Sequence, residues 1–232
     1  MPNDPNKQVS DLLLALSAHC ATHKGEFLKK IVSATRPLMF WLDYLRNTIS
    51  RQTADRLLDA TQAAIIEVAG CLSLGLVRPA IPSIRVQLEL VLGWIYFNDH
   101  PVEWIRFEKT TRDYEFPGAV IKYLSANSDR YHDRFKLLAS KKTRKTGDPY
   151  GVLSIHVHST SPYSAPNIGP LSALVRPAAS CNECVGLQVE VTEYLSDVLA
   201  SWYADRWHDL PTPITTGIKA RLGSAKLKEF CR

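Results

Sequence analysis

Apolar residues recur three and four positions apart along most of the chain, which is the spacing of one helix face. The first such run, Val9 to Val32, predicts one helix that ends at Arg36-Pro37. Leu38 to Ile49 predicts a short aromatic-rich helix, and a long helix with one apolar face is expected from Thr53 onward.

Pro79 and Pro82 are expected to interrupt that long helix. The chain has no run of alternating apolar and polar residues and no hairpin turn signal, so no β-strand is predicted. We therefore predict an all-α protein, a single-domain helical bundle around a buried central helix. The further helices are expected over about 83–97, 102–114, 118–126, 129–139, 150–158 and 184–207.

Residues 1–209 are expected to form the one helical domain, because no break in composition divides the chain of 232 residues. Within it, a basic loop is expected at about 140–149, and four prolines predict an irregular connection at about 159–181. Residues 210–232 are predicted to be a basic C-terminal tail, mobile or ordered by a partner.

The predicted central helix carries one ionic stripe on an otherwise apolar circumference. At 100° per residue, Arg85 and Glu89 share one face with Gly93. An arginine four residues before a glutamate is the weaker order for a helical ion pair, so we expect a partner from another segment. Both a structural ion pair and a functional cleft, with space left open at Gly93, fit this pattern.

Composition limits the class of protein without naming a reaction. With 45% hydrophobic and 22% charged residues, the chain has enough apolar side chains for a substantial core. The net charge of +5 slightly favours an acidic partner such as nucleic acid or a phosphorylated ligand.

The cell compartment follows from the cysteines and the apolar runs. Five scattered cysteines favour reduced thiols over a disulfide framework, and the N-terminal residues do not have the pattern of a secretory signal. The most apolar stretch, Ala63 to Val77, contains Glu67 and is too short to span a bilayer. We therefore expect a cytoplasmic protein without a membrane span.

Two histidines stand among apolar residues in the predicted helix 150–158. In a helix, His158 shares a face with Ser154 while His156 points elsewhere. His158 is therefore the candidate general acid or base, with Arg85 as the phosphate clamp; the alternative is a core histidine bonded to Ser154 or a carbonyl.

Cys181 and Cys184 have the two-residue spacing of a zinc half-site, and His156 and His158 stand upstream as further candidate ligands. Against zinc, no second cysteine pair is present, and two histidines at this spacing point apart on a helix. The alternative is a pair of partly buried thiols at a helix start, and we predict neither a metal nor a cofactor. The sequence has no Walker loop, GxSxG or HExxH motif.

Residues 129–145 form the most basic segment, with the aromatic residues Tyr131 and Phe135 between the cations. This composition is typical both of a solvated face and of a surface that attracts nucleic acid or phosphate. The candidate nucleic-acid-binding residues are Arg130, Arg134, Lys141, Lys142, Arg144 and Lys145.

The Arg85-x-x-x-Glu89 helix, followed by Trp94-Ile-Tyr96 and later by Leu153-Ser154-x-x-Val157-His158, resembles uncharacterised bacterial helical proteins related to the HEPN superfamily. The resemblance covers about residues 57–158. It implies a HEPN-like bundle, often dimeric, in which Arg85, Glu89 and His158 meet in one cleft. The nuclease members carry an arginine followed four to six residues later by histidine, a spacing that this chain lacks.

The expected function is therefore that of a HEPN-like protein in a bacterial defence or mobile-element system that binds RNA, a nucleotide or a partner subunit. One alternative is a metal-independent endoribonuclease, in which His158 is the acid or base, Arg85 holds phosphate and Glu89 orients either. Another is a purely structural helical subunit of a complex. A homodimer or a partner protein is expected.

Overall fold

The computed structural model describes residues 4–110, 117–158 and 169–231. No β-strand occurs in these three stretches, so the predicted all-α class is confirmed. The elements are α1 (Pro5–His23), α2 (Glu26–Tyr44), a π-helical turn η1 (Leu45–Ile49), α3 (Arg56–Ser73), α4 (Val77–Asp99), α5 (Pro101–Thr110), α6 (Pro117–Asn127), α7 (Tyr131–Ala139), α8 (Pro149–His158), a 3₁₀ turn η2 (Leu171–Leu174), α9 (Ala178–Trp202), a 3₁₀ turn η3 (Ala204–Arg206) and α10 (Thr212–Phe230).

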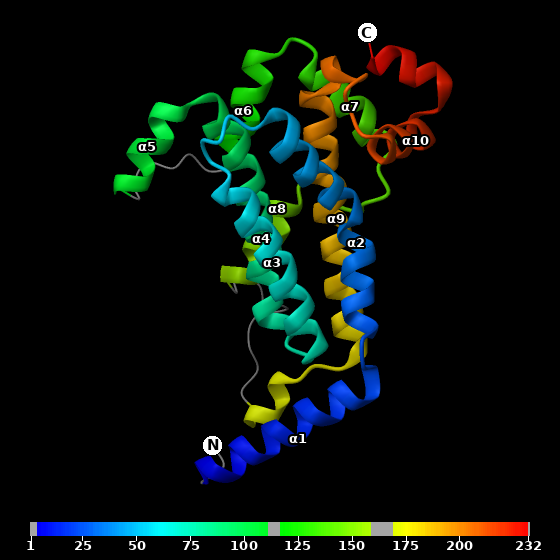
Figure 1. Ribbon diagram of the computed structural model, residues 1–232. Coiled ribbons are helices and arrows are strands. Elements are labelled where there is room, and N and C mark those ends of the chain that lie inside the picture. Colours follow the sequence, from blue (N-terminus) through cyan, green and yellow to red (C-terminus); the bar gives the residue numbers. More distant parts are fainter. Residues whose placement is uncertain (1–3, 111–116, 159–168, 232) are drawn as a thin grey trace.

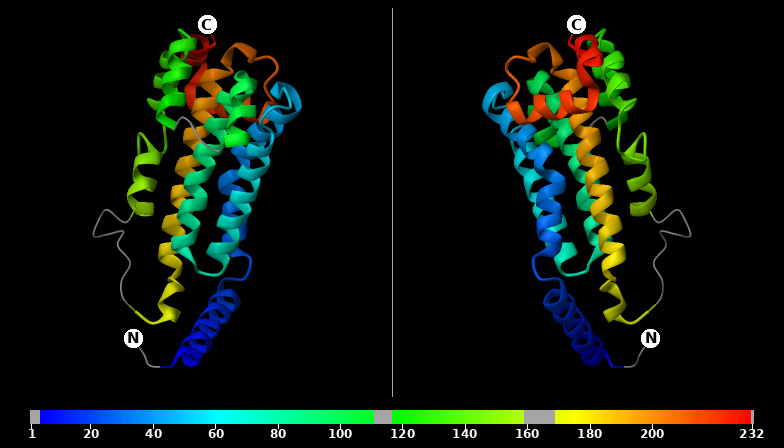
Figure 2. Two further views of the ribbon diagram at one scale, coloured as in Figure 1. Left: turned by 90° about the vertical axis from the view of Figure 1, so that its left-hand side faces the viewer. Right: turned by 90° about the vertical axis from the view of Figure 1, so that its right-hand side faces the viewer.

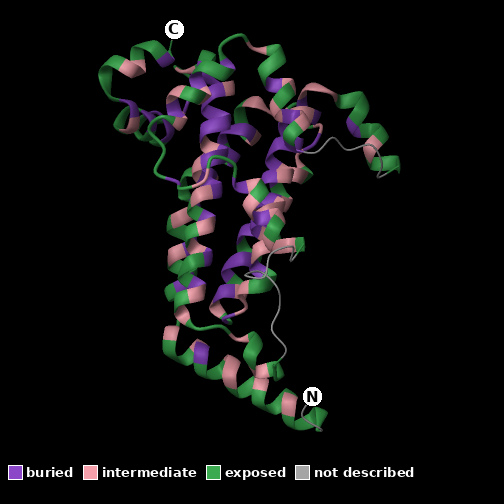
Figure 3. Ribbon diagram, turned by 180° about the vertical axis from the view of Figure 1, so that it is seen from behind, coloured by how far each residue is buried: buried purple, intermediate pink, exposed green. Residues whose placement is uncertain are grey.

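Four long helices, α2, α3, α4 and α9, run side by side along the molecule (Figures 1 and 2). Helix α4 packs on α3 and α9, and α8, α6 and α5 contact it as well. Its inner residues, among them Leu88, Val91 and Trp94, are fully buried. Figure 3 shows that buried positions concentrate where these long helices face one another. None of the helices in the described ranges has both the length and the apolarity needed to cross a bilayer.

A buried amide pair joins α4 to α9. The Gln87 side chain donates to Gln188 Oε1 at 3.0 Å, and the Gln188 side chain donates to Gln87 Oε1 at 2.7 Å. Both residues are completely buried, so the reciprocal bonds satisfy polar groups that would otherwise destabilise the core. The pair thereby fixes the register of the two helices.

Helix α1 lies at the far end of the bundle, almost entirely outside the core (Figures 1 and 3). Its single buried residue, His19, packs on Gly75 in the turn between α3 and α4, and its Nε2 lies 3.3 Å from the carbonyl oxygen of Leu72 at the end of α3. Gly75 in that turn has φ +74, and a Cβ there would lie 2.8 Å from Val175. Glycine is therefore required at the point where α1 and the residues before α9 contact the bundle.

Two predicted boundaries near the N-terminus are wrong. The expected helix over 9–32 is broken at Lys24, whose φ of +48 ends α1 before Gly25. Helix α2 then continues through Pro37 to Tyr44, although proline lacks the N–H that a helix interior uses. The buried side chains on both sides of Pro37, Thr35 and Leu38, show that packing outweighs this loss.

The predicted starts of the helices over 83–97 and 184–207 are also wrong, because the prolines that precede these ranges do not prevent an earlier start. Helix α4 begins at Val77, with Pro79 in its first turn, where a proline removes no helical hydrogen bond. Pro82 lies inside the helix and removes one, yet the helix continues through it with Ala80 and Ile84 buried on either side. Helix α9 begins at Ala178, directly after Pro177, so the end of the predicted connection 159–181 is helical. Residues 159–168 of that connection, and the end of the helix predicted over 102–114, lie outside the described residues.

The predicted C-terminal tail is the helix α10. Ile214, Ile218 and Leu222 recur every four residues and are buried, and α10 contacts α2 and α7. Gly223, with φ +69 and ψ 172, divides the helix at a kink. This conformation is essentially restricted to glycine, so Gly223 lets the two halves of α10 follow different faces of the bundle.

We expect Gly223→Ala to lower the free energy of unfolding by about 1–3 kcal/mol, because alanine strains at this backbone conformation. The matched control is Gly70→Ala on the exposed face of α3, where an added Cβ meets no atom within 4 Å. That substitution should raise stability by about 0.5–1 kcal/mol. Urea unfolding followed by circular dichroism measures both, and equal effects would contradict the assigned kink.

Candidate functional site

Arg85 and Glu89, the predicted ionic stripe of α4, form an ion pair of 2.9 Å on a partly exposed face. The third member is Tyr150 of α8, whose hydroxyl accepts from Arg85 Nη2 at 2.6 Å and donates to Glu89 Oε1 at 3.3 Å. The Arg85 guanidinium carbon also lies 4.8 Å from the Tyr150 ring centre, within cation–π range. The expected partner from another segment is therefore present, and it is a tyrosine.

His158 lies exposed at the C-terminal end of the same helix, with about 12 Å of helix rise between it and Tyr150. The contacts that the structure gives Arg85 are with Glu89 and Tyr150. Arg85 and Glu89, the two predicted site residues on α4, are thus brought together. His158 is not joined to Arg85 by a hydrogen bond. The catalytic role of Arg85, Glu89 and His158 remains a prediction.

The four candidate ligands of the alternative zinc site lie on two separate helices. Cys181 and Cys184 are buried near the start of α9, whereas His156 and His158 lie on α8. Burial raises the pKa of both thiols, that of Cys184 to about 12, which disfavours the thiolate that binds metal. Within the described ranges, no three histidine, cysteine or acidic side chains are grouped closely enough to hold a metal ion.

The predicted basic loop is bound tightly to α9 by acidic side chains. Glu193 accepts hydrogen bonds from the backbone and hydroxyl of Thr143, and Glu190 does the same for Thr146. Arg144 is buried rather than exposed, and it pairs with Asp197 and Glu193. The prediction that Arg144 lies on a nucleic-acid-binding surface is therefore wrong, because this cation is neutralised inside the bundle.

Arg221 of α10 completes the network. It pairs with Asp197 at 2.6 Å and with Glu193 at 3.4 Å, and it donates to the Leu138 carbonyl at 3.2 Å. Two arginines and two carboxylates thus join the loop after α7, helix α9 and helix α10 without net charge. We call Arg144, Glu193, Asp197 and Arg221 the ionic network.

Glu193 has a lowered pKa in this setting. Burial alone would raise the pKa of this carboxyl, but hydrogen bonds from Thr143 and the charges of Arg221 and Arg144 outweigh it. The network is therefore arranged to hold Glu193 ionised.

Three cations of the predicted segment line a groove between α7 and α10 that encloses about 530 Å³. Two of its charged residues are acidic, Asp133 and Glu229. Its basic residues are Arg130, Arg134, Lys136 and Lys226. We call this the basic groove; Lys226, from the part of the chain expected to be a tail, was not anticipated as one of its residues.

Arg134 forms the floor of the basic groove. Its side chain is 3% exposed, pairs with Asp205 at 2.6 Å and donates from Nε to the Phe230 carbonyl at 3.1 Å. Its Nη1 is buried without a hydrogen-bond partner among the described residues. Arg130, in contrast, is exposed at the groove. Lys141, Lys142 and Lys145 are also exposed beyond it.

No protein-family model, curated protein or solved structure matches the chain. The relation to HEPN proteins therefore remains a prediction.

We expect Arg144→Met to lower the free energy of unfolding by about 3–5 kcal/mol, because it leaves Asp197 buried with fewer opposite charges. Lys142→Met, two positions away and exposed, is the control and should change stability by less than about 0.5 kcal/mol. Chemical unfolding of both variants measures the difference. A loss for Arg144→Met no larger than that of the control would show that the network does not stabilise the fold.

The lowered pKa of Glu193 predicts acid sensitivity. Since its pKa in the folded state lies below the ordinary value of 4.5, its stabilisation is complete above about pH 4.5 and is lost as the pH falls through the lowered value. In Glu193→Gln, the free energy of unfolding should therefore fall less steeply between about pH 5 and about pH 3 than in the wild type. Parallel slopes in urea titrations across this range would contradict the assignment.

Proposed function

We propose that the protein binds RNA through the basic groove between α7 and α10, as a non-cleaving, HEPN-like member of a bacterial defence or mobile-element system. The observation that carries the proposal is the gathering of three basic side chains that are not buried, against two acidic ones, around this groove. The fourth, Arg134, is buried and already paired with Asp205. Such an excess of cations attracts a phosphate backbone. Exposed Lys141 and Lys142 extend the positive surface beyond the groove.

The aromatic residues of this segment support a backbone-directed mode of binding. Tyr131 is buried, and the half-buried Phe135 packs between it and Tyr194, at ring-centre distances of 6.0 and 5.8 Å. These rings serve the core and offer no open platform for stacked bases. We therefore propose recognition of phosphates with little dependence on sequence and a strong dependence on salt.

The test is fluorescence anisotropy with a labelled single-stranded RNA of mixed sequence at about 50 and about 200 mM salt. In the Arg130→Gln/Lys226→Gln double variant we expect about tenfold weaker binding or more, and a salt slope reduced by about 1.4, for two lost phosphate contacts. Both changed side chains lie at the groove while buried Arg134 is left in place.

The matched control is Lys109→Gln/Lys122→Gln, which removes two exposed charges from α5 and α6. Its affinity should stay within about twofold of the wild type, because these cations lie outside the groove. Equal weakening in both double variants would assign binding to net charge alone, and no binding by the wild type would refute the proposal.

Cleavage is tested on the same RNA in EDTA. We expect the RNA to stay intact, because Arg85 is held by Glu89 and Tyr150 and, among the residues that the structure describes, has no hydrogen bond to an imidazole. Gel electrophoresis over hours, with Arg85→Ala and His158→Ala in parallel, reports the outcome. Cleavage by the wild type that both variants lose would establish the ribonuclease instead.

A further inference from the structure

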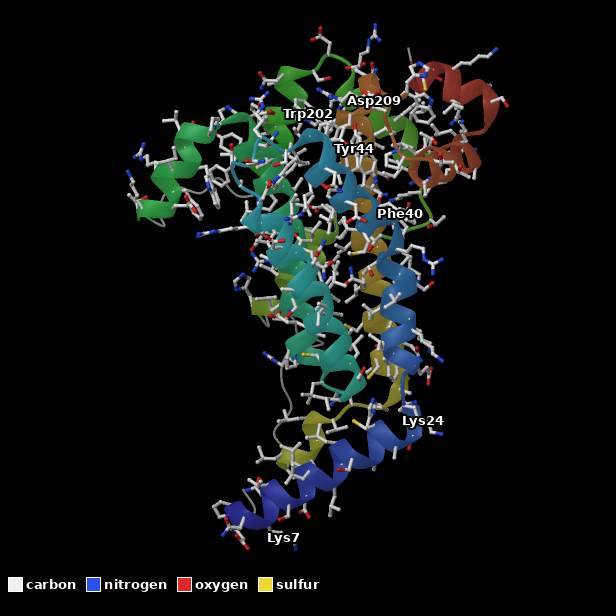
Figure 4. The ribbon with its side chains drawn as sticks, in the orientation of Figure 1. Lys7, Lys24, Phe40, Tyr44, Trp202 and Asp209 are labelled. Atoms are coloured by element: carbon white, nitrogen blue, oxygen red, sulfur yellow. The ribbon has the colours of Figure 1, made fainter. Side chains whose placement is uncertain are left out.

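A second cavity lies between α2, α9 and α10 and encloses about 330 Å³. Its wall is mainly apolar and comes from all three helices: Pro37, Phe40 and Trp41 from α2, Val189 from α9, and Ile214 and Ile218 from α10. Figure 4 places Phe40 on α2, in the part of the bundle where α10 packs. Cavities of this size, formed by apolar and aromatic side chains with few polar groups, are typical binding sites for small molecules.

In the described stretches, most charged residues at the cavity are paired with one another, but Arg36 is not. Glu193, Asp197 and Arg221 line one side, but with Arg144 behind them they form the neutral ionic network. Arg36 also lines the cavity and is exposed. Among the described residues, no hydrogen bond or ion pair engages its guanidinium. Within the described part of the chain, the cavity therefore has a mainly apolar interior and one cation, Arg36, without an ion-pair partner.

We propose that this cavity binds a small amphipathic carboxylate, with its aliphatic or aromatic body between Phe40 and Ile218 and its carboxylate on Arg36. Burial of the body removes apolar surface from water, and a guanidinium is a strong, planar partner for a carboxylate. The site is separate from the basic groove and does not rest on RNA binding.

The probe is octanoate, with 1-octanol as the neutral molecule of the same chain length, titrated into the full-length protein by isothermal calorimetry. We expect saturable octanoate binding at one site per chain. Arg36→Gln should weaken octanoate binding tenfold or more and leave octanol binding within about twofold, because only the charged contact is removed. Lys29→Gln, an exposed charge on the same helix, should change neither.

A second pair of variants tests the cavity itself. Gly217 lines it, and a Cβ added there meets no atom within 4 Å, so Gly217→Leu should fill the space and reduce octanoate binding at least tenfold. Gly217→Ala adds one methyl group and should keep octanoate binding within about threefold. If Gly217→Leu loses its helical circular dichroism, Ala34→Leu on α2 fills the same cavity from another wall.

Three outcomes would overturn the proposal: no saturable binding of octanoate by the wild type, equal octanoate affinity in wild type and Arg36→Gln, or octanoate binding unchanged in a folded cavity-filling variant. Octanoate binding that depends on both Arg36 and the free cavity supports it. RNA binding by the Arg36→Gln variant should equal that of the wild type, which separates this site from the basic groove.

Discussion

The buried charge of Arg144 is the constraint on which the C-terminal half of the structure depends. A guanidinium that is almost wholly removed from water must be matched by carboxylates, and Asp197 and Glu193 supply them from α9. The same carboxylates hold Arg221 of α10. The loop after α7 and the last helix are thus fixed to one face of α9, and the apolar cavity and the basic groove both lie beside this junction.

The two halves of α10, before and after Gly223, border two different sites at this junction. Before Gly223, its apolar residues Ile214 and Ile218 close a cavity against α2 and α9; after Gly223, Lys226 and Glu229 lie at the groove against α7. One element therefore borders an apolar site and a cationic site on different faces. An unkinked helix has no means of following both faces, so the backbone freedom of one glycine separates them.

The central helix shows how polar groups are retained in an apolar element. Gln87 is hydrogen-bonded to Gln188 in the core, and one end of the Arg85 guanidinium is bound by Glu89 and Tyr150 at a partly exposed edge. In each case a neighbouring helix supplies a partner, which compensates for the loss of water. The polar positions of α4 thereby specify where α8 and α9 pack, and the charged edge contributes to the assembly of the fold.

The sequence by itself determined the helical class and most helix positions, because a period of three to four residues is a local property of the chain. It also indicated that Arg85 needed a partner from elsewhere, since its order with Glu89 is unfavourable within one helix. It did not determine that Tyr150 is that partner, that residues 212–230 are a packed helix, or that Arg134 and Arg144 are buried while Arg130 is exposed. Only the tertiary structure decided these points, because the exposure and partners of a side chain depend on which distant segments pack around it.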